Sequence, residues 1–128
     1  MATWQQVKNY VYANYQVSDD SGGMLTLLFQ TGGGRSQKVL IVHVDTGNEF
    51  ASILFMSPVA AWSQVSADRV LRATEEVPVS IRSTGDFIVA THVQLLASVD
   101  ETEIDLPLAM ITLQADQLEK VLGIGDLH

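Results

Sequence analysis

The chain has 128 residues, 47% of them hydrophobic and 17% charged, which predicts a single α+β domain spanning residues 1–128 around one core. The formal net charge is −8, from 15 acidic and 7 scattered basic residues, and it opposes binding to nucleic acid or to an anionic membrane. Cysteine is absent, which excludes disulfides, thiol nucleophiles and thiolate metal sites. Because no signal-peptide pattern and no apolar run of ~18–20 residues is found, we expect a cytoplasmic protein that does not enter a membrane.

The first predicted element is a helix. Thr3 and Gln6 have the spacing of a capping box, and apolar residues recur at helical intervals after them, so a helix is predicted over Thr3–Tyr15. Its Trp4 side is expected to face the core. The polar run 18–23 then predicts a turn.

Three strands are predicted next. Segments Met24–Gln30 and Lys38–Asp45 are rich in apolar and β-forming residues, and the glycine-rich segment 31–35 between them predicts a β-hairpin. A third strand is predicted over Phe50–Met56. Pro58 is expected to end it, because proline cannot donate to a sheet ladder.

A short helix and a second hairpin follow. The helix is predicted to begin at Ser63 or Ser66 and to close at Val77, before a proline. Segments Val79–Arg82 and Phe87–Ala97, separated by a turn sequence, predict two further strands.

The last predicted element is a C-terminal helix. Asp105 is the expected N-cap, Pro107 fits its first turn, and Gly123 follows its end. The apolar stripe expected to face the core consists of Met110, Ile111, Ala115, Leu118 and Leu122. The resulting order α-β-β-β-α-β-β-α is that of an α+β fold with one antiparallel sheet covered by helices.

The predicted strands are apolar on both sides. Leu40, Val42 and Val44 alternate with Val39 and Ile41, whereas a sheet with one wet face alternates apolar with polar residues. If three helices cover one face, the other face exposes an apolar patch of the kind that marks interfaces. This pattern favours a homodimer over the alternative, in which the helices divide between the two faces.

Two patterns that suggest bound ligands are better explained structurally. The run Gly32–Lys38 resembles a phosphate cradle, but it joins two strands and lacks the Gly-Lys-Ser/Thr sequence that leads a P-loop into a helix, which favours a hairpin turn. The histidines His43, His92 and His128 are isolated. His43 and His92 could converge across the sheet, but no further ligands are indicated, so structural roles are favoured.

The acidic and aromatic residues also lack a catalytic pattern. The acidic run Asp100–Asp105 precedes a helix and is typical of capping, and Asp19–Asp20 fits a polar turn without the ligand spacing of a calcium loop. No Gly-x-Ser-x-Gly elbow is present. The aromatic residues have no basic groove beside them and are interpreted as core or interface residues: Trp4, Tyr10, Tyr12, Tyr15 and Trp62. We therefore name no catalytic, cofactor-binding or metal-binding residue and expect no cofactor.

A family resemblance adds to this interpretation. It is carried by Trp4-Gln5-Gln6-Val7 with the Tyr10 and Tyr15 end of the first helix, by Val70-Leu71-Arg72, and by the closing segment 115–122. With the element order, the acidic balance and the implied dimer, these segments resemble the type III secretion chaperone-like fold, including the YbjN-like proteins. The resemblance covers nearly the whole chain and implies a binding scaffold, since the secretion chaperones of this fold bind an unfolded client segment along apolar surfaces of a dimer.

Three function classes remain: a dimeric protein-binding or chaperone-like module, a structural or regulatory dimer without a client, and a small enzyme or ligand-binding domain. The first is favoured because the sequence supplies many apolar groups but no coherent catalytic constellation. We expect a non-enzymatic homodimer that binds a protein client. The alternative is a small-molecule-binding domain or a small enzyme with an unrecognised site.

Overall fold

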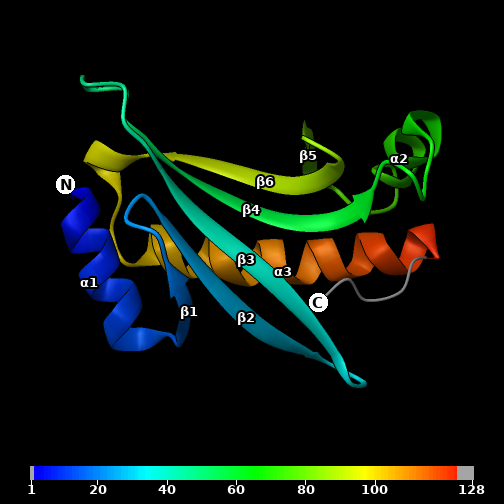
Figure 1. Ribbon diagram of the computed structural model, residues 1–128, viewed down its shortest axis with the longest axis horizontal. Helices are drawn as coiled ribbons and strands as arrows, with labels where there is room; N and C mark the ends of the chain where they lie inside the picture. Colours follow the sequence, from blue (N-terminus) through cyan, green and yellow to red (C-terminus); the bar gives the residue numbers. More distant parts are fainter. Residues whose placement is uncertain (1, 124–128) are drawn as a thin grey trace.

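The computed structural model describes residues 2–123, and its architecture confirms the predicted α+β class (Figure 1). One six-stranded antiparallel sheet has the order β1-β2-β3-β4-β6-β5. None of the helices in this range is long and apolar enough to cross a membrane. The elements are α1 (Trp4–Asn14), β1 (Val17–Asp20), β2 (Met24–Gly32), β3 (Arg35–Val44), β4 (Ser52–Ala61), α2 (Ala67–Ala73), β5 (Ser80–Thr84), β6 (Phe87–Leu95), the 3-10 turn η1 (Leu96–Ser98) and α3 (Thr102–Leu122).

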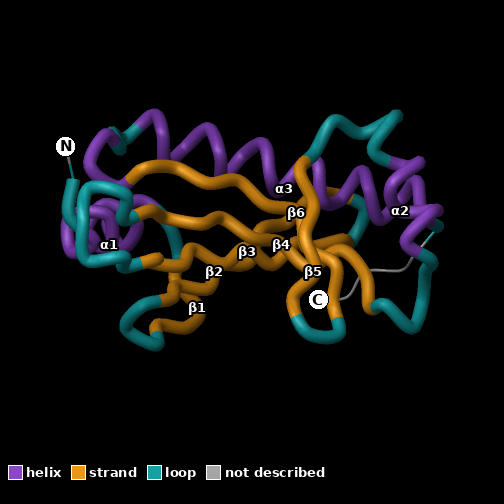
Figure 2. Tube along the Cα trace, turned by 90° about the horizontal axis from the view of Figure 1, so that it is seen from above, coloured by secondary structure: helices purple, strands orange, loops and turns teal. Residues whose placement is uncertain are grey.

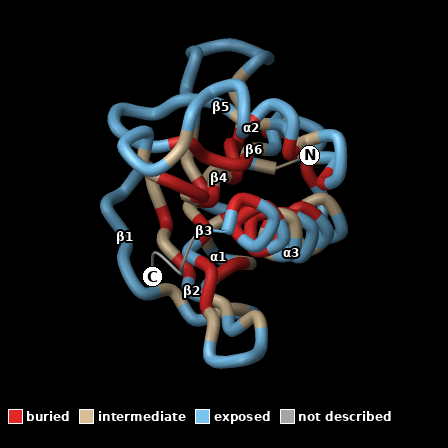
Figure 3. Tube along the Cα trace, turned by 90° about the vertical axis from the view of Figure 1, so that its right-hand side faces the viewer, coloured by how far each residue is buried: buried red, intermediate tan, exposed pale blue. Residues whose placement is uncertain are grey.

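The helices lie on one side of the sheet. Helix α3 runs along that face, with α1 near its N-terminal end and α2 near its C-terminal end (Figure 2). The buried residues gather between the sheet and α3 (Figure 3). One buried cluster joins α1 and the first half of α3 to β2, β3 and β4, and a second joins α2 and the end of α3 to β4 and β6.

Local signals account for the helix starts of α1 and α2. The Thr3 side chain accepts a hydrogen bond from the Gln6 backbone, and the Gln6 side chain accepts one from the Thr3 backbone, which confirms the capping box. The Ser66 side chain caps α2 through a single hydrogen bond, which it accepts from Arg69 N. Helix α2 ends at Ala73, before the predicted limit at Val77.

The predicted turn over 18–23 is partly wrong, because Val17–Asp20 forms the extra strand β1. Three of its four residues are exposed, so it lacks the apolar alternation that marks a strand. Contacts distant in sequence stabilise this edge: Lys8 pairs with Asp20 at 3.1 Å, and the Trp4 indole donates to Gly22 O at 2.8 Å. The turn itself is confined to residues 21–23.

The prediction that Pro58 ends a strand is also wrong. Strand β4 continues to Ala61, with a register shift between Pro58 and Ala60. A bulge tolerates proline because the regular ladder is interrupted there. The carbonyl of Pro58 accepts a hydrogen bond from the Gln37 side chain at 3.0 Å, so its acceptor is satisfied.

Helix α3 begins earlier than predicted. Thr102 is its first residue, so Asp105 lies inside the first turn and is not the N-cap, and Pro107 falls in the second turn. Asp100 supplies the cap interaction, since its Oδ1 accepts from Glu103 N at 2.9 Å. Strand β6 accordingly ends at Leu95, two residues before the predicted limit. Gly123 ends the helix as expected, with a φ of 70° that favours glycine.

Candidate functional site

The side of the sheet opposite α3 carries apolar side chains with no described helix over them; we call it the open face. Cross-strand register places Met24, Val42, Leu54 and Val93 in one row and Val44, Ser52 and Leu95 in another. Its exposed apolar residues include Leu28 (50%), Val44 (39%), Val93 (61%) and Leu95 (46%). The exposed apolar face expected from the two-sided strands is therefore present, and the alternative with helices on both faces does not hold for residues 2–123.

A second apolar surface lies on the outside of α3. Leu106, Met110 and Leu113 are 56%, 54% and 58% exposed, and their spacing of four and three residues places them on one side of the helix. We call these three residues the α3 ridge. The prediction that Met110 belongs to the core stripe is wrong, whereas Ile111, Ala115, Leu118 and Leu122 are buried as predicted.

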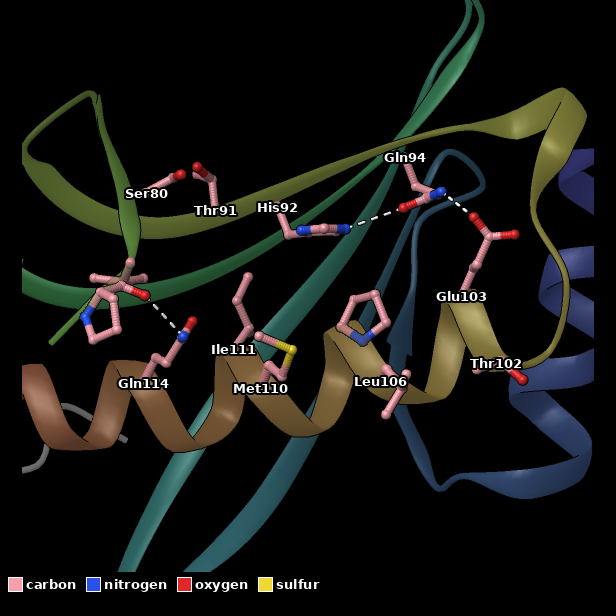
Figure 4. A pocket seen from close by; sticks show the side chains of 13 residues that line it. Ser80, Thr91, His92, Gln94, Thr102, Glu103, Leu106, Met110, Ile111 and Gln114 are labelled. Carbon is pink, nitrogen blue, oxygen red and sulfur yellow. Dashed lines mark hydrogen bonds between the residues drawn. The ribbon is translucent and has the colours of Figure 1, made fainter.

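A cavity of about 350 Å³ lies between the α3 ridge and strands β5 and β6; we call it the β6 cavity (Figure 4). Its apolar wall includes Pro78, Leu106, Met110 and Ile111. The space is at the small end of the range for ligand pockets, about 300–1,000 Å³. It is large enough for an apolar side chain of a partner or for a small molecule.

One side of the β6 cavity is lined by three hydrogen-bonded polar side chains, His92 and Gln94 of β6 and Glu103 of α3, which we call the polar series. His92 Nε2 lies 3.1 Å from Gln94 Oε1, and the Gln94 amide donates to Glu103 Oε2 (Figure 4). Since the amide oxygen of Gln94 is an acceptor, this arrangement requires His92 to donate from Nε2. Sequence reasoning did not find this series, because it depends on β6 lying beside the first turn of α3.

On the other flank of the ridge, a hollow of about 330 Å³ lies between α3 and β2. Tyr15, Phe29, Leu108 and Leu113 contribute to its lining, and the rings of Tyr15 and Phe29 meet edge to face at 6.0 Å between centroids. The α3 ridge therefore stands between two depressions.

Asp105 fixes α1 against α3 at the edge of that hollow. It accepts hydrogen bonds from the hydroxyls of Tyr10, at 2.7 Å, and Tyr15, at 2.6 Å. The bond to Asp105 together with burial raises the pKa of Tyr10 to about 12, and burial followed by the same type of bond raises the pKa of Tyr15. Both tyrosines therefore remain protonated donors at neutral pH, and they position the start of the ridge.

The glycine run is the β2–β3 hairpin, as favoured from the sequence. Gly33 and Gly34 have φ values of 60° and 76° within the turn. Arg35, which follows them, pairs with Asp116 and Glu119 of α3, each at 2.7 Å. Burial alone would raise the pKa of Asp116, but the Arg35 and Lys120 cations outweigh it and hold that pKa below the ordinary aspartate range. The cation beside the glycines thus links the hairpin to α3.

The histidines have separate surroundings. His43 stacks on Trp4 with ring centroids 5.2 Å apart, whereas His92 contacts Phe55 and lines the β6 cavity. His128 lies outside the described residues. Within residues 2–123, no group of three or more histidine and acidic side chains is arranged to hold a metal ion.

Four of the acidic residues considered from the sequence have structural partners or cap a helix: Asp20, Asp100, Glu103 and Asp105. Asp20 accepts hydrogen bonds from Gly22 N at 2.8 Å and from the Tyr12 hydroxyl at 2.7 Å, and these bonds, followed by the contact with Lys8, lower the pKa of Asp20. In the run 100–105, Asp100 caps α3, Glu103 belongs to the polar series and Asp105 binds the two tyrosines.

The aromatic residues considered from the sequence do not share one surface patch. Trp4 lies against the core cluster, and the Trp62 indole donates to Ser83 Oγ at 2.8 Å near the β5–β6 hairpin. Tyr12 is exposed beside Asp20. Each ring is therefore assigned to a local contact.

Comparison with solved structures identifies the fold. The structure matches a chain of the ExsC-ExsE complex with a TM-score of 0.66 and 15% identity, over 95% of this chain and 97% of that one. It matches a chain of the HopA1-SchA chaperone-effector complex with a TM-score of 0.62 and 8% identity, over 88% of each chain. The chain has the type III secretion chaperone-like fold. The predicted resemblance is thereby confirmed for this fold, and membership of the YbjN-like proteins stays a prediction.

The chaperone-like fold is supported by structure alone. No protein-family model matches the sequence, and no curated protein matches it. At 15% and 8% identity, these two neighbours show that the fold is shared. The open face and the α3 ridge are features of this chain's own structure.

Proposed function

We propose that the protein is a non-enzymatic, chaperone-like module that binds another polypeptide and acts as a homodimer in the cytoplasm. The observation that carries the proposal is the presence of two separate exposed apolar surfaces, the open face and the α3 ridge, on a secretion chaperone-like fold. Large exposed apolar surfaces mark interaction sites, because leaving them in water is unfavourable. Both structural neighbours come from complexes with a second protein, which supports a protein partner.

The two surfaces have different shapes and are assigned different partners. The open face is a sheet surface with apolar rows on several strands, which suits stacking against the same face of a second copy. The α3 ridge is narrow and lies between two depressions, which suits side chains of a client segment. A dimer built through the open face leaves both ridges accessible.

The alternative function is binding of a small molecule, favoured by the β6 cavity with its apolar wall and convergent polar groups. Polypeptide binding and small-molecule binding predict different results in two experiments. Photo-crosslinking of the whole protein in native cells should recover a polypeptide bound at a fixed stoichiometry, and a metabolite library should leave the melting temperature unchanged. Recovery of the protein alone, combined with a saturable thermal shift or turnover for one metabolite, would replace the proposal with the alternative.

A further inference from the structure

The charge of the β6 cavity indicates which client segments it accepts. Glu103 lies at the rim and is half-buried, and its Oε2 accepts from Gln94. Among residues 2–123, no lysine or arginine forms an ion pair with Glu103, and no donor bonds its other oxygen, Oε1. The Glu103 carboxylate, in the first turn of α3, therefore brings to a largely apolar cavity a negative charge with no ion-pair partner among residues 2–123 and an oxygen open to a further donor.

The surroundings of Glu103 strengthen this negative charge. Asp100 and Glu101 are exposed at the same end of α3, and the described residues that line the β6 cavity include no lysine or arginine. Lys8, the basic residue of α1, is already paired with Asp20. A cationic ligand is attracted to such a site, and an anionic ligand is repelled.

Apart from the His92 imidazole, the remaining polar side chains of the described lining are neutral. Gln94 is fixed between His92 and Glu103, and Gln114 donates to Pro78 O at 2.9 Å, so both amides are engaged. The rest of the wall is apolar, with Met110 and Leu106 exposed at the rim and Ile111 buried at the base. The cavity thus combines one carboxylate acceptor with room for an apolar side chain.

We propose that the β6 cavity binds a basic, apolar segment of the client polypeptide, with an apolar side chain against Met110 and Ile111 and a lysine or arginine against Glu103. This inference deepens the proposed function and rests on it. The apolar contact supplies affinity by burying exposed side chains, and the ion pair supplies selectivity among segments of equal hydrophobicity.

Three matched fluorescent peptides test the inference. They share one apolar sequence and differ only in carrying lysine, glutamine or glutamate at the same positions, and binding is measured by anisotropy with the full-length protein. We expect the lysine peptide to bind about tenfold more tightly than the glutamine peptide, a factor typical of a charge-assisted contact that is partly screened. The glutamate peptide should bind weakest, and high salt should bring the three affinities together.

Matched variants locate the effect. Glu103→Gln retains an acceptor for Gln94 and should remove the preference for lysine, whereas Glu101→Gln removes the same charge from an exposed position two residues away and should change affinity less than about twofold. Met110→Glu should weaken binding of the glutamine peptide, while Leu71→Glu, on α2 and of similar exposure (61% against 54%), should leave its affinity unchanged.

The outcomes separate this inference from the proposed function. Equal binding of all three peptides, or a lysine preference that survives Glu103→Gln, would overturn the inference and leave polypeptide binding standing. Failure of every peptide to bind would overturn both.

Discussion

Val93 offers the sharpest test of the dimer assignment, because it is 61% exposed on the open face. Fully burying a valine contributes about 1.5–3 kcal/mol, so burying the exposed fraction contributes about 1–2 kcal/mol per copy and ~2–4 kcal/mol in a symmetric pair. Since 1.4 kcal/mol corresponds to a tenfold change in affinity, Val93→Glu should raise the dimer dissociation constant by roughly 30- to 700-fold. Burial of the added charges would increase this loss.

Sedimentation equilibrium over a range of concentrations measures the effect, and Leu71→Glu provides the control. Leu71 has the same exposed fraction, 61%, but lies on α2. Both side chains are exposed in the single chain, so thermal unfolding should show that either variant folds with little loss of stability. We expect a monomer for Val93→Glu and a dimer for Leu71→Glu. The reverse result would assign the dimer to the α2 end, and a monomeric wild type at high micromolar concentration would refute the homodimer.

Two further predictions concern the contacts that position the ridge. Arg35→Ala removes the Arg35 cation from the buried Asp116 and Glu119 carboxylates and should lower the free energy of unfolding by about 3 kcal/mol in urea titration. An unchanged midpoint would show that these ion pairs are dispensable. The folded-state pKa values of Tyr10 and Tyr15 are raised, so their contribution to stability is fully present below pH ~10, the unfolded tyrosine value. It is lost as the pH rises above that value through the folded-state pKa, which is about 12 for Tyr10. Tyr15→Phe should cost about 1 kcal/mol at neutral pH and make the alkaline decline shallower, and an unaltered decline would contradict the role of Asp105.

Elements with a strong local signal were predictable from the sequence. The capping box at Thr3 and Gln6, the N-cap at Ser66 and the glycines around Gly33 depend on interactions between residues close in the chain. The two-sided apolar strands indicated an exposed sheet face for the same reason, since strand periodicity alone determines which side chains share a face.

Elements stabilised by distant contacts were not predictable in this way. Strand β1 has a turn-like sequence, and Asp20 is held by Lys8 and Tyr12 of α1. Strand β4 passes Pro58 through a bulge, and the Gln37 side chain of β3 satisfies the carbonyl there. In each case tertiary structure overrides a local signal that is normally reliable.

The candidate site likewise has one part that follows from local sequence spacing and one part that depends on tertiary contacts. The α3 ridge could have been predicted from the sequence, because the spacing of Leu106, Met110 and Leu113 forms a second apolar stripe. Assigning Met110 to the core stripe hid this pattern. The β6 cavity required knowledge of the fold, because Gln94 and Glu103 belong to different elements and meet only when β6 packs beside α3.

Position-resolved photo-crosslinking tests the central claim most directly. A photoreactive amino acid is placed at Met110, at Val93 or at Leu71, and the adducts formed in native cells are analysed by intact mass. The account predicts a foreign polypeptide from Met110, a second copy of the chain from Val93, and neither from Leu71. Foreign adducts formed equally from Met110 and Leu71, or no polypeptide adduct from Met110, would contradict polypeptide binding at the α3 ridge.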